Sequence, residues 1–213
     1  PYFRRRYPEL LVSWARLFSG KVRDPLVGRD HLWGVIAGLA ACLVLCLENI
    51  PPALFRAPGQ TPMPVDPLTL AGLGGLVSYT AFSVADSLFG LFMAAASLFF
   101  GRLVLRKAPL AAAVPWLLIF VYAAGRENPI FEMTGAAVIA TIFLLLLFRG
   151  GLLGFAVGFG VFRLLSVAPL TPDLSRWFAG YGLFCLAAVL AIALFGFWAA
   201  RGGAIFSGAA ADD

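Results

Sequence analysis

Long apolar runs, interrupted by single charges or by proline, limit most strongly how this chain can fold. Of its 213 residues, 61% are hydrophobic and only 13% are charged, whereas a soluble domain carries about 25% charged residues. So few charges cannot cover a water-exposed surface, and most of the outer surface must therefore face lipid. The runs approach the ~20 residues that a helix needs to cross a bilayer. We predict an all-α, polytopic membrane helix bundle.

About six transmembrane helices are expected. The predicted spans cover residues 31–47, 87–105, 108–124, 131–148, 151–168 and 179–200. A further run at 68–84 is only moderately apolar because it contains three glycines, two serines and two threonines. Six prolines between Pro51 and Pro67 predict an extended loop before it, since proline removes a helix donor.

Basic residues decide between six spans and seven. With six spans, twelve Lys and Arg residues lie on the cytoplasmic side and four lie outside; if 68–84 also crosses, the division is ten to six. The positive-inside rule favours six, with both termini cytoplasmic. Residues 68–84 are then expected to form a re-entrant or interface-lying helix.

Three regions are expected: a basic juxtamembrane segment (1–30), a transmembrane domain (31–201) and a C-terminal tail (202–213). Apolar residues at helical spacing predict an amphipathic helix from Pro8 to Phe18, whose basic neighbours would contact anionic lipid headgroups. The candidate lipid contacts are Arg4, Arg5, Arg6, Arg16, Lys21 and Arg23. A juxtamembrane linker without lipid specificity is the alternative. Nucleic acid is not an expected partner, because the charges flank membrane spans.

Ionisable residues in or near the membrane are the candidates for function, because charge in hydrocarbon is expensive. They are Asp86, Glu132, Arg163 and Asp173, with Glu48 at the end of the first span. Each of them would serve either as an interface anchor or as part of an ion or substrate path. A path requires two or more of them to converge in the bundle. For Arg163, the sequence suggests snorkelling to the interface or pairing with Asp173.

No catalytic, cofactor-binding or metal-binding site is predicted. His31 is the only histidine, and the sequence contains no HExxH or GxSxG motif. The GLGG sequence at 72–75 lacks the lysine and flanking strand of a phosphate loop. Two GxxxG pairs, Gly150/Gly154 and Gly154/Gly158, predict close helix packing instead.

Two stretches carry a resemblance to a known family. They read VRDPLVGRDHLWGVIAGLA (22–40) and APLTPDLSRWFAGYGLFCLAAVLAIALFGFWAARGG (168–203). They resemble the start and the end of the C-terminal membrane domain of acidobacterial-type bacterial serine/threonine protein kinases. The order of the spans, the proline-rich loop and RLVLRKAPLA between them also fit. RDPLVGRD and PLTPDLSRWFAG are the specific parts.

The resemblance implies a cytoplasmic kinase domain before Pro1 in the same polypeptide, and a location in the bacterial inner membrane. No ATP or Mg²⁺ residue can be transferred, because this sequence has no kinase glycine-rich loop, HRD loop or DFG motif. The first hypothesis is therefore a membrane anchor that also senses a signal and transmits it by helix rearrangement or homodimerisation. The alternative is a small permease or transporter subunit.

Overall fold

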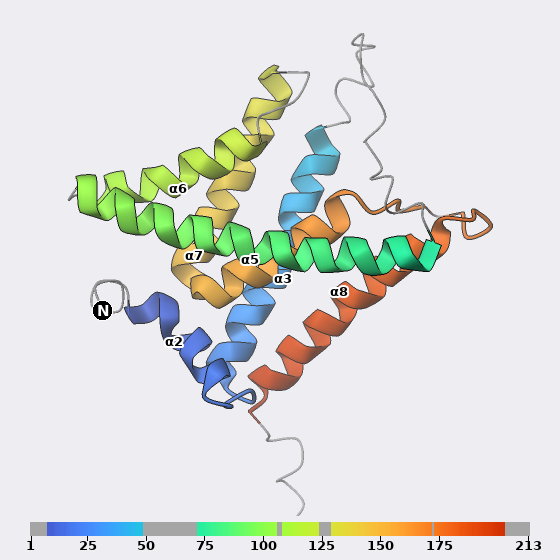
Figure 1. Ribbon diagram of the computed structural model, residues 1–213, viewed down its shortest axis with the longest axis horizontal. Coiled ribbons are helices and arrows are strands. Elements are labelled where there is room, and N and C mark those ends of the chain that lie inside the picture. The colour runs from blue at the N-terminus through green and yellow to red at the C-terminus, as the bar shows by residue number, and fades with distance from the viewer. Residues whose placement is uncertain (1–7, 49–71, 106–107, 124–128, 172, 203–213) are drawn as a thin grey trace, which may run out of the picture.

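The computed structural model describes residues 8–48, 72–105, 108–123, 129–171 and 173–202 (Figure 1). All regular secondary structure in these residues is helical, which confirms the predicted fold class. The helices are α2 (Pro8–Phe18), α3 (Pro25–Glu48), α5 (Gly72–Leu105), α6 (Ala108–Ala123), α7 (Pro129–Ser166) and α8 (Ala179–Ala200).

Four of the described helices, α3, α5, α7 and α8, are long and apolar enough to cross a membrane. α6 has 16 residues and a length of about 24 Å, less than the ~30 Å of hydrocarbon. Large apolar side chains point outward from all of these helices, among them Leu43, Phe92, Leu117, Leu145 and Leu190. An apolar surface of this extent marks contact with lipid.

α5 differs from the prediction, because residues 72–105 form one helix rather than a re-entrant segment followed by a span. Only Ala85 and Asp86 separate the two predicted runs, and neither residue breaks a helix. With 34 residues, α5 is about 51 Å long, far more than the hydrocarbon thickness. In Figure 1 it runs at a steep angle to α3 and α8, and such a helix fits a bilayer only when strongly tilted.

α7 is a helical hairpin. Gly151 has φ 63° and ψ −165°, and the chain reverses there, so residues 129–150 and 152–166 form two arms. The rings of Phe143 and Phe162 are 5.7 Å apart, whereas nineteen residues of straight helix would separate them by about 28 Å. The two arms correspond to the two apolar runs predicted on either side of residue 150.

The bend in α7 gives a first prediction. Replacing Gly151 with alanine is expected to destabilise the protein by about 2 kcal/mol, because this backbone region is essentially restricted to glycine. The added Cβ would also lie 3.0 Å from the Leu10 carbonyl oxygen. Thermal unfolding of the detergent-purified protein measures the loss. Gly74→Ala is the control, since a Cβ at Gly74 meets nothing within 4 Å; equal melting of the two variants would contradict the assigned bend.

Glycines allow α3 and the second arm of α7 to pack backbone to backbone. A Cβ at Gly34 would lie 2.6 Å from the Gly154 carbonyl oxygen, and a Cβ at Gly38 would lie 2.6 Å from that of Gly158. Real Cβ atoms do not approach so closely, so both positions require glycine. The close packing predicted for Gly154/Gly158 is confirmed, and its partner is the Gly34/Gly38 pair of α3.

α8 packs against the other side of α3. A Cβ at Gly28 would overlap the backbone of Ala200, and Gly196 lies against His31 and Leu32. α3 is thus held between the α7 hairpin and α8, and the α7 hairpin, which packs against all five other described helices, forms the centre of the described bundle.

Candidate functional site: a charged pair and an apolar pocket beside α5

Two of the predicted membrane charges meet in the structure. Arg163 Nε, near the end of α7, lies 2.5 Å from Asp86 Oδ2 of α5, and each side chain is 20% exposed. The convergence that a functional role requires is therefore present for this pair. The expected pairing of Arg163 with Asp173 is wrong, because Asp173 pairs with Arg176 at 3.0 Å.

Polar side chains line the face of α5 that packs on α7. This polar stripe consists of Tyr79, Ser83, Asp86 and Ser87, spaced by about one helical turn, and its tyrosine and serines are buried. The Tyr79 hydroxyl donates a hydrogen bond of 2.6 Å to the Arg163 carbonyl oxygen. α5 therefore contacts Arg163 twice, once at the backbone and once at the guanidinium.

The contact between Asp86 and Arg163 is an ion pair without hydrogen-bond geometry. Asp86 Oδ2 and Arg163 Nε are both buried, and neither makes a hydrogen bond within the described residues. Attraction between buried charges offsets their lost hydration only when their other donors and acceptors are also satisfied. Within the described residues the pair therefore leaves one buried acceptor and one buried donor without a hydrogen bond.

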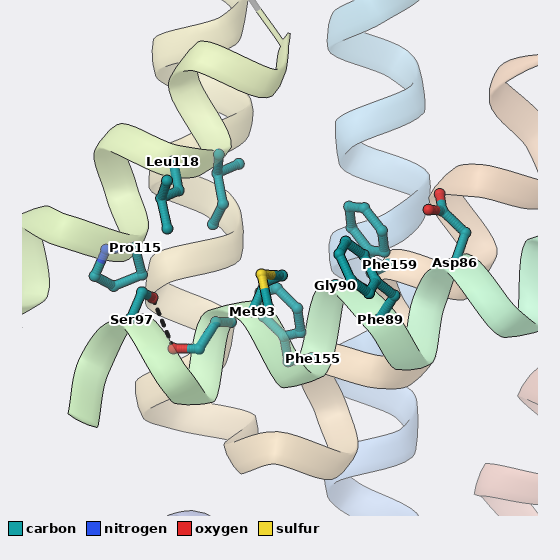
Figure 2. Close-up of a pocket in the computed structure, with 11 residues that line it drawn as sticks. Asp86, Phe89, Gly90, Met93, Ser97, Pro115, Leu118, Phe155 and Phe159 are labelled. Carbon is teal, nitrogen blue, oxygen red and sulfur yellow. Dashed lines mark hydrogen bonds between the residues drawn. The ribbon is translucent and has the colours of Figure 1, made fainter. Parts of the chain in front are cut away.

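An apolar pocket of about 220 Å³ begins at Asp86 and extends between α5, α6 and α7. Figure 2 shows Asp86 at one end of the pocket and Ser97 and Pro115 at the other. Its lining residues are Asp86, Phe89, Gly90, Met93, Ala94, Ser97, Pro115, Leu118, Ile119, Phe155 and Phe159. The Ser97 hydroxyl donates to the Ala94 carbonyl within the same helix, so Asp86 is the polar group that this pocket offers to a ligand.

The other predicted membrane charges do not join this site. The carboxylate of Asp173 accepts hydrogen bonds from the Ser175 hydroxyl and backbone N–H and from Arg176. The Ser175 hydrogen bonds, followed by that from Arg176, lower the pKa of Asp173 below its ordinary value. Glu132 lies on α7 and Glu48 ends α3, but their side chains lie outside the described part of the chain.

The predicted amphipathic helix is present as α2, and it docks onto the bundle. Leu10 is buried against Gly151 at the α7 bend. The buried Ser13 hydroxyl donates to the carboxylate of Asp30 on α3. One face of α2 therefore packs on protein, although the sequence suggested a helix lying on lipid.

Two candidate lipid contacts have partners within the protein. Arg16 Nη1 lies 2.6 Å from Asp24 Oδ2, and the Arg23 guanidinium lies 4.3 Å above the Trp198 ring centre. Burial raises the pKa of Asp24, but the Leu26 N–H and the charges of Arg16 and Lys21 together lower it more, so it lies below its usual value. The Arg16–Asp24 contact thus weakens only as the pH falls through this lowered pKa.

Lipid binding stays a prediction for all six basic residues. Lys21 lies near Asp24, and the three consecutive arginines Arg4, Arg5 and Arg6 lie outside the described residues.

The part of the chain that the structure describes contains no group of three His, Cys, Asp or Glu side chains that could hold a metal ion. His31 packs against the ring of Phe195, with centroids 5.1 Å apart, on a different helix pair from the Asp86 site. The site can hold charge, couple α5 to α7 and bind an apolar group.

Sequence reasoning missed the polar stripe and the Gly34/Gly38 pair. Of this stripe, only Ser83 enters the prediction, as one of the two serines that lower the apolarity of residues 68–84, although the spacing of four residues places Tyr79, Ser83 and Ser87 on one helix face. Gly34 and Gly38 form a GxxxG pair inside the first span, and the same motif that identified Gly154/Gly158 could have found them.

Comparison of the chain with protein-family models, curated proteins and solved structures finds no match.

Proposed function

We propose that this chain is the membrane-anchoring and signal-transmitting domain of a bacterial serine/threonine protein kinase, whose catalytic domain precedes it in the cytoplasm. The docking of α2 onto the bundle is the observation that carries the proposal. A domain attached before α2 would be joined to the membrane helices through a packed helix rather than a free linker. The resemblance of residues 22–40 and 168–203 to kinase membrane domains supports a kinase as that domain.

The contacts of α2 suggest how a signal would reach the kinase. Leu10 touches the bend of α7, and Ser13 bonds to Asp30 of α3. A shift of α7 relative to α3 would therefore change the position of α2 on the bundle. Small helix movements at interfaces are amplified in this way in other switching proteins. The excess of basic residues near the N-terminus favours its position on the cytoplasmic side.

The sequence that the gene encodes immediately before Pro1 tests the anchor directly. A kinase domain is expected there, and deletion of residues 31–201 from the intact protein should move kinase activity from the membrane fraction to the soluble fraction. A start codon directly before Pro1, or a kinase that stays membrane-bound after the deletion, would contradict the proposal.

Signal transmission predicts an effect of Ser13→Ala on the intact kinase. Removing the hydrogen bond to Asp30 should change the rate of autophosphorylation about tenfold, equivalent to ~1.4 kcal/mol, the lower end for bonds to charged groups. Autophosphorylation in isolated membranes is the measurement. Ser19→Ala is the control, because the exposed Ser19 hydroxyl donates only to the Arg16 carbonyl of its own turn. Equal rates for both variants and the wild type would exclude transmission through α2.

A small permease or transporter subunit is the second candidate, favoured by the Asp86–Arg163 pair between α5 and α7. Charged groups inside a membrane bundle commonly mark ion or substrate paths. The apolar lining of the adjoining pocket weighs against a polar substrate. Flux of small ions and amino acids into proteoliposomes, abolished by Asp86→Asn, is the result that would favour this candidate over the first.

A further inference from the structure

The pocket beside Asp86 has a closed floor and an open rim. Ala94, Ser97, Pro115, Phe155 and Phe159 are buried and form the floor. The residues at the rim, Phe89, Met93 and Leu118, are exposed on the outer surface of α5 and α6. Because that surface faces hydrocarbon, a ligand reaches the pocket from the bilayer rather than from water.

The volume of the pocket limits the size of the ligand that can enter it. At about 220 Å³, the pocket is larger than the ~150 Å³ cavity that takes up benzene in a well-studied engineered protein. It is smaller than the ~300 Å³ at which sites for drug-sized molecules begin. One flexible alkyl or isoprenoid segment fits this range, and the rest of a longer chain can leave through the open rim into the bilayer. A two-chain phospholipid does not fit.

The polar end of the pocket limits the headgroup. Asp86 lines the pocket with a side chain that is 20% exposed, whereas its Oδ2 atom and Arg163 Nε are buried against each other and Arg163 does not line the pocket. The two charges neutralise each other, so an ionic headgroup would disturb the pair. A hydroxyl can donate a hydrogen bond to the exposed part of the Asp86 carboxylate without adding a charge.

We propose that this pocket binds one long-chain alcohol or other hydroxyl-ended, single-chain amphiphile from the bilayer, with the first part of its chain between α5, α6 and α7 and its hydroxyl donating to the carboxylate of Asp86, whose charge Arg163 offsets. Binding would join α5 to both arms of the α7 hairpin, because Phe155, Phe159 and Arg163 belong to the second arm and α6 packs on the first through the Trp116–Thr141 hydrogen bond of 3.1 Å. The site stands on its own contacts and does not depend on the proposed kinase function.

Photolabelling of the full chain in lipid nanodiscs tests the site. The probe is a hexadecanol that carries a diazirine in mid-chain, compared with the matching hexadecanoic acid and hexadecane probes. We expect the alcohol to label peptides that contain residues 89–97, 115–119 and 155–159 at least fivefold more than the other two probes do. Uniform labelling of all lipid-facing helices, or equal labelling by the three probes, overturns the proposal.

Two tryptophan variants distinguish binding in the pocket from general contact of the probe with the lipid-facing surface. Met93→Trp narrows the pocket at its rim and should reduce labelling by the alcohol at least fivefold. Leu88→Trp, at an exposed position of α5 outside the pocket, should leave labelling unchanged. Equal effects of the two tryptophan substitutions on labelling would show that the alcohol does not bind in the pocket.

The headgroup contact is tested with the double variant Asp86→Asn/Arg163→Gln, which removes both charges and leaves neither unpaired. It should retain the fold, measured by its melting temperature, and lose the preference for alcohol over hexadecane. If the preference is unchanged, the hydroxyl does not bind at this pair and the proposal fails.

Discussion

Replacing Gly34 with leucine is expected to disrupt the bundle at its centre. The Cβ alone would lie 2.6 Å from the Gly154 carbonyl oxygen and 2.9 Å from Val157 Cβ, so α3 and α7 would have to move apart. Overpacking against backbone costs about 3 kcal/mol or more, which for a chain of this size lowers the melting temperature by roughly 6–12 °C. Thermal unfolding and the monodisperse yield in detergent measure the effect.

Gly180→Leu is the matched control for this prediction. A Cβ at Gly180 on α8 meets nothing within 4 Å, so the variant should stay within about 0.5 kcal/mol of the wild type. Gly158→Leu should be as harmful as Gly34→Leu, and the double variant should cost less than the sum, since both residues disrupt one helix crossing. Full additivity would show that the two glycines do not share a contact.

Removing one member of the Asp86–Arg163 pair is expected to cost about 3 kcal/mol, the lower end for buried pairs because each side chain is 20% exposed. Arg163→Met leaves the Asp86 carboxylate among apolar side chains, and Asp86→Leu leaves the guanidinium unpaired. The double variant Asp86→Leu/Arg163→Met should recover most of the loss, because no isolated charge remains. Melting temperatures of the three variants in one detergent give the coupling energy.

Arg176→Met provides the comparison with an exposed pair. Arg176 and Asp173 lie 3.0 Å apart in the loop before α8, with side chains 63% and 49% exposed, and such pairs contribute at most about 1 kcal/mol. If Arg163→Met costs no more than Arg176→Met, the Asp86 site is hydrated and carries no buried charge.

Much of the fold could be predicted from the sequence alone, because the long apolar run that forms a membrane helix can be recognised without a structure. The last span was predicted at residues 179–200, which are the bounds of α8. The two arms of α7 were separated correctly, since glycine and arginine interrupt the apolar run near residue 150. The failure at α5 has a physical cause. Three glycines and several hydroxyl groups lower the apolarity of its first half, but a serine or threonine hydroxyl can bond within a helix, as that of Thr80 does to the Leu76 carbonyl.

The two charged residues of the site could be predicted from the sequence, but their contact with each other could not. Asp86 and Arg163 were selected because charge is rare in such a segment. Their contact depends on the crossing of α5 over the end of α7, and hydropathy carries no information about crossing angles. The docking of α2 was hidden for the same reason, because an amphipathic helix has the same pattern whether it packs on lipid or on protein.

The packing of α3 on the second arm of α7 has a consequence for biosynthesis. Cys42 on α3 contacts the Phe162 carbonyl on α7, 120 residues later in the chain. At about 5–20 residues per second, the ribosome needs roughly 6–24 seconds to add the helix that covers the glycine face of α3. During that interval α3 lies in the membrane with Gly34 and Gly38 facing lipid or an insertion factor. Assembly of the bundle is therefore completed late. It also requires that no other helix binds this face of α3 first.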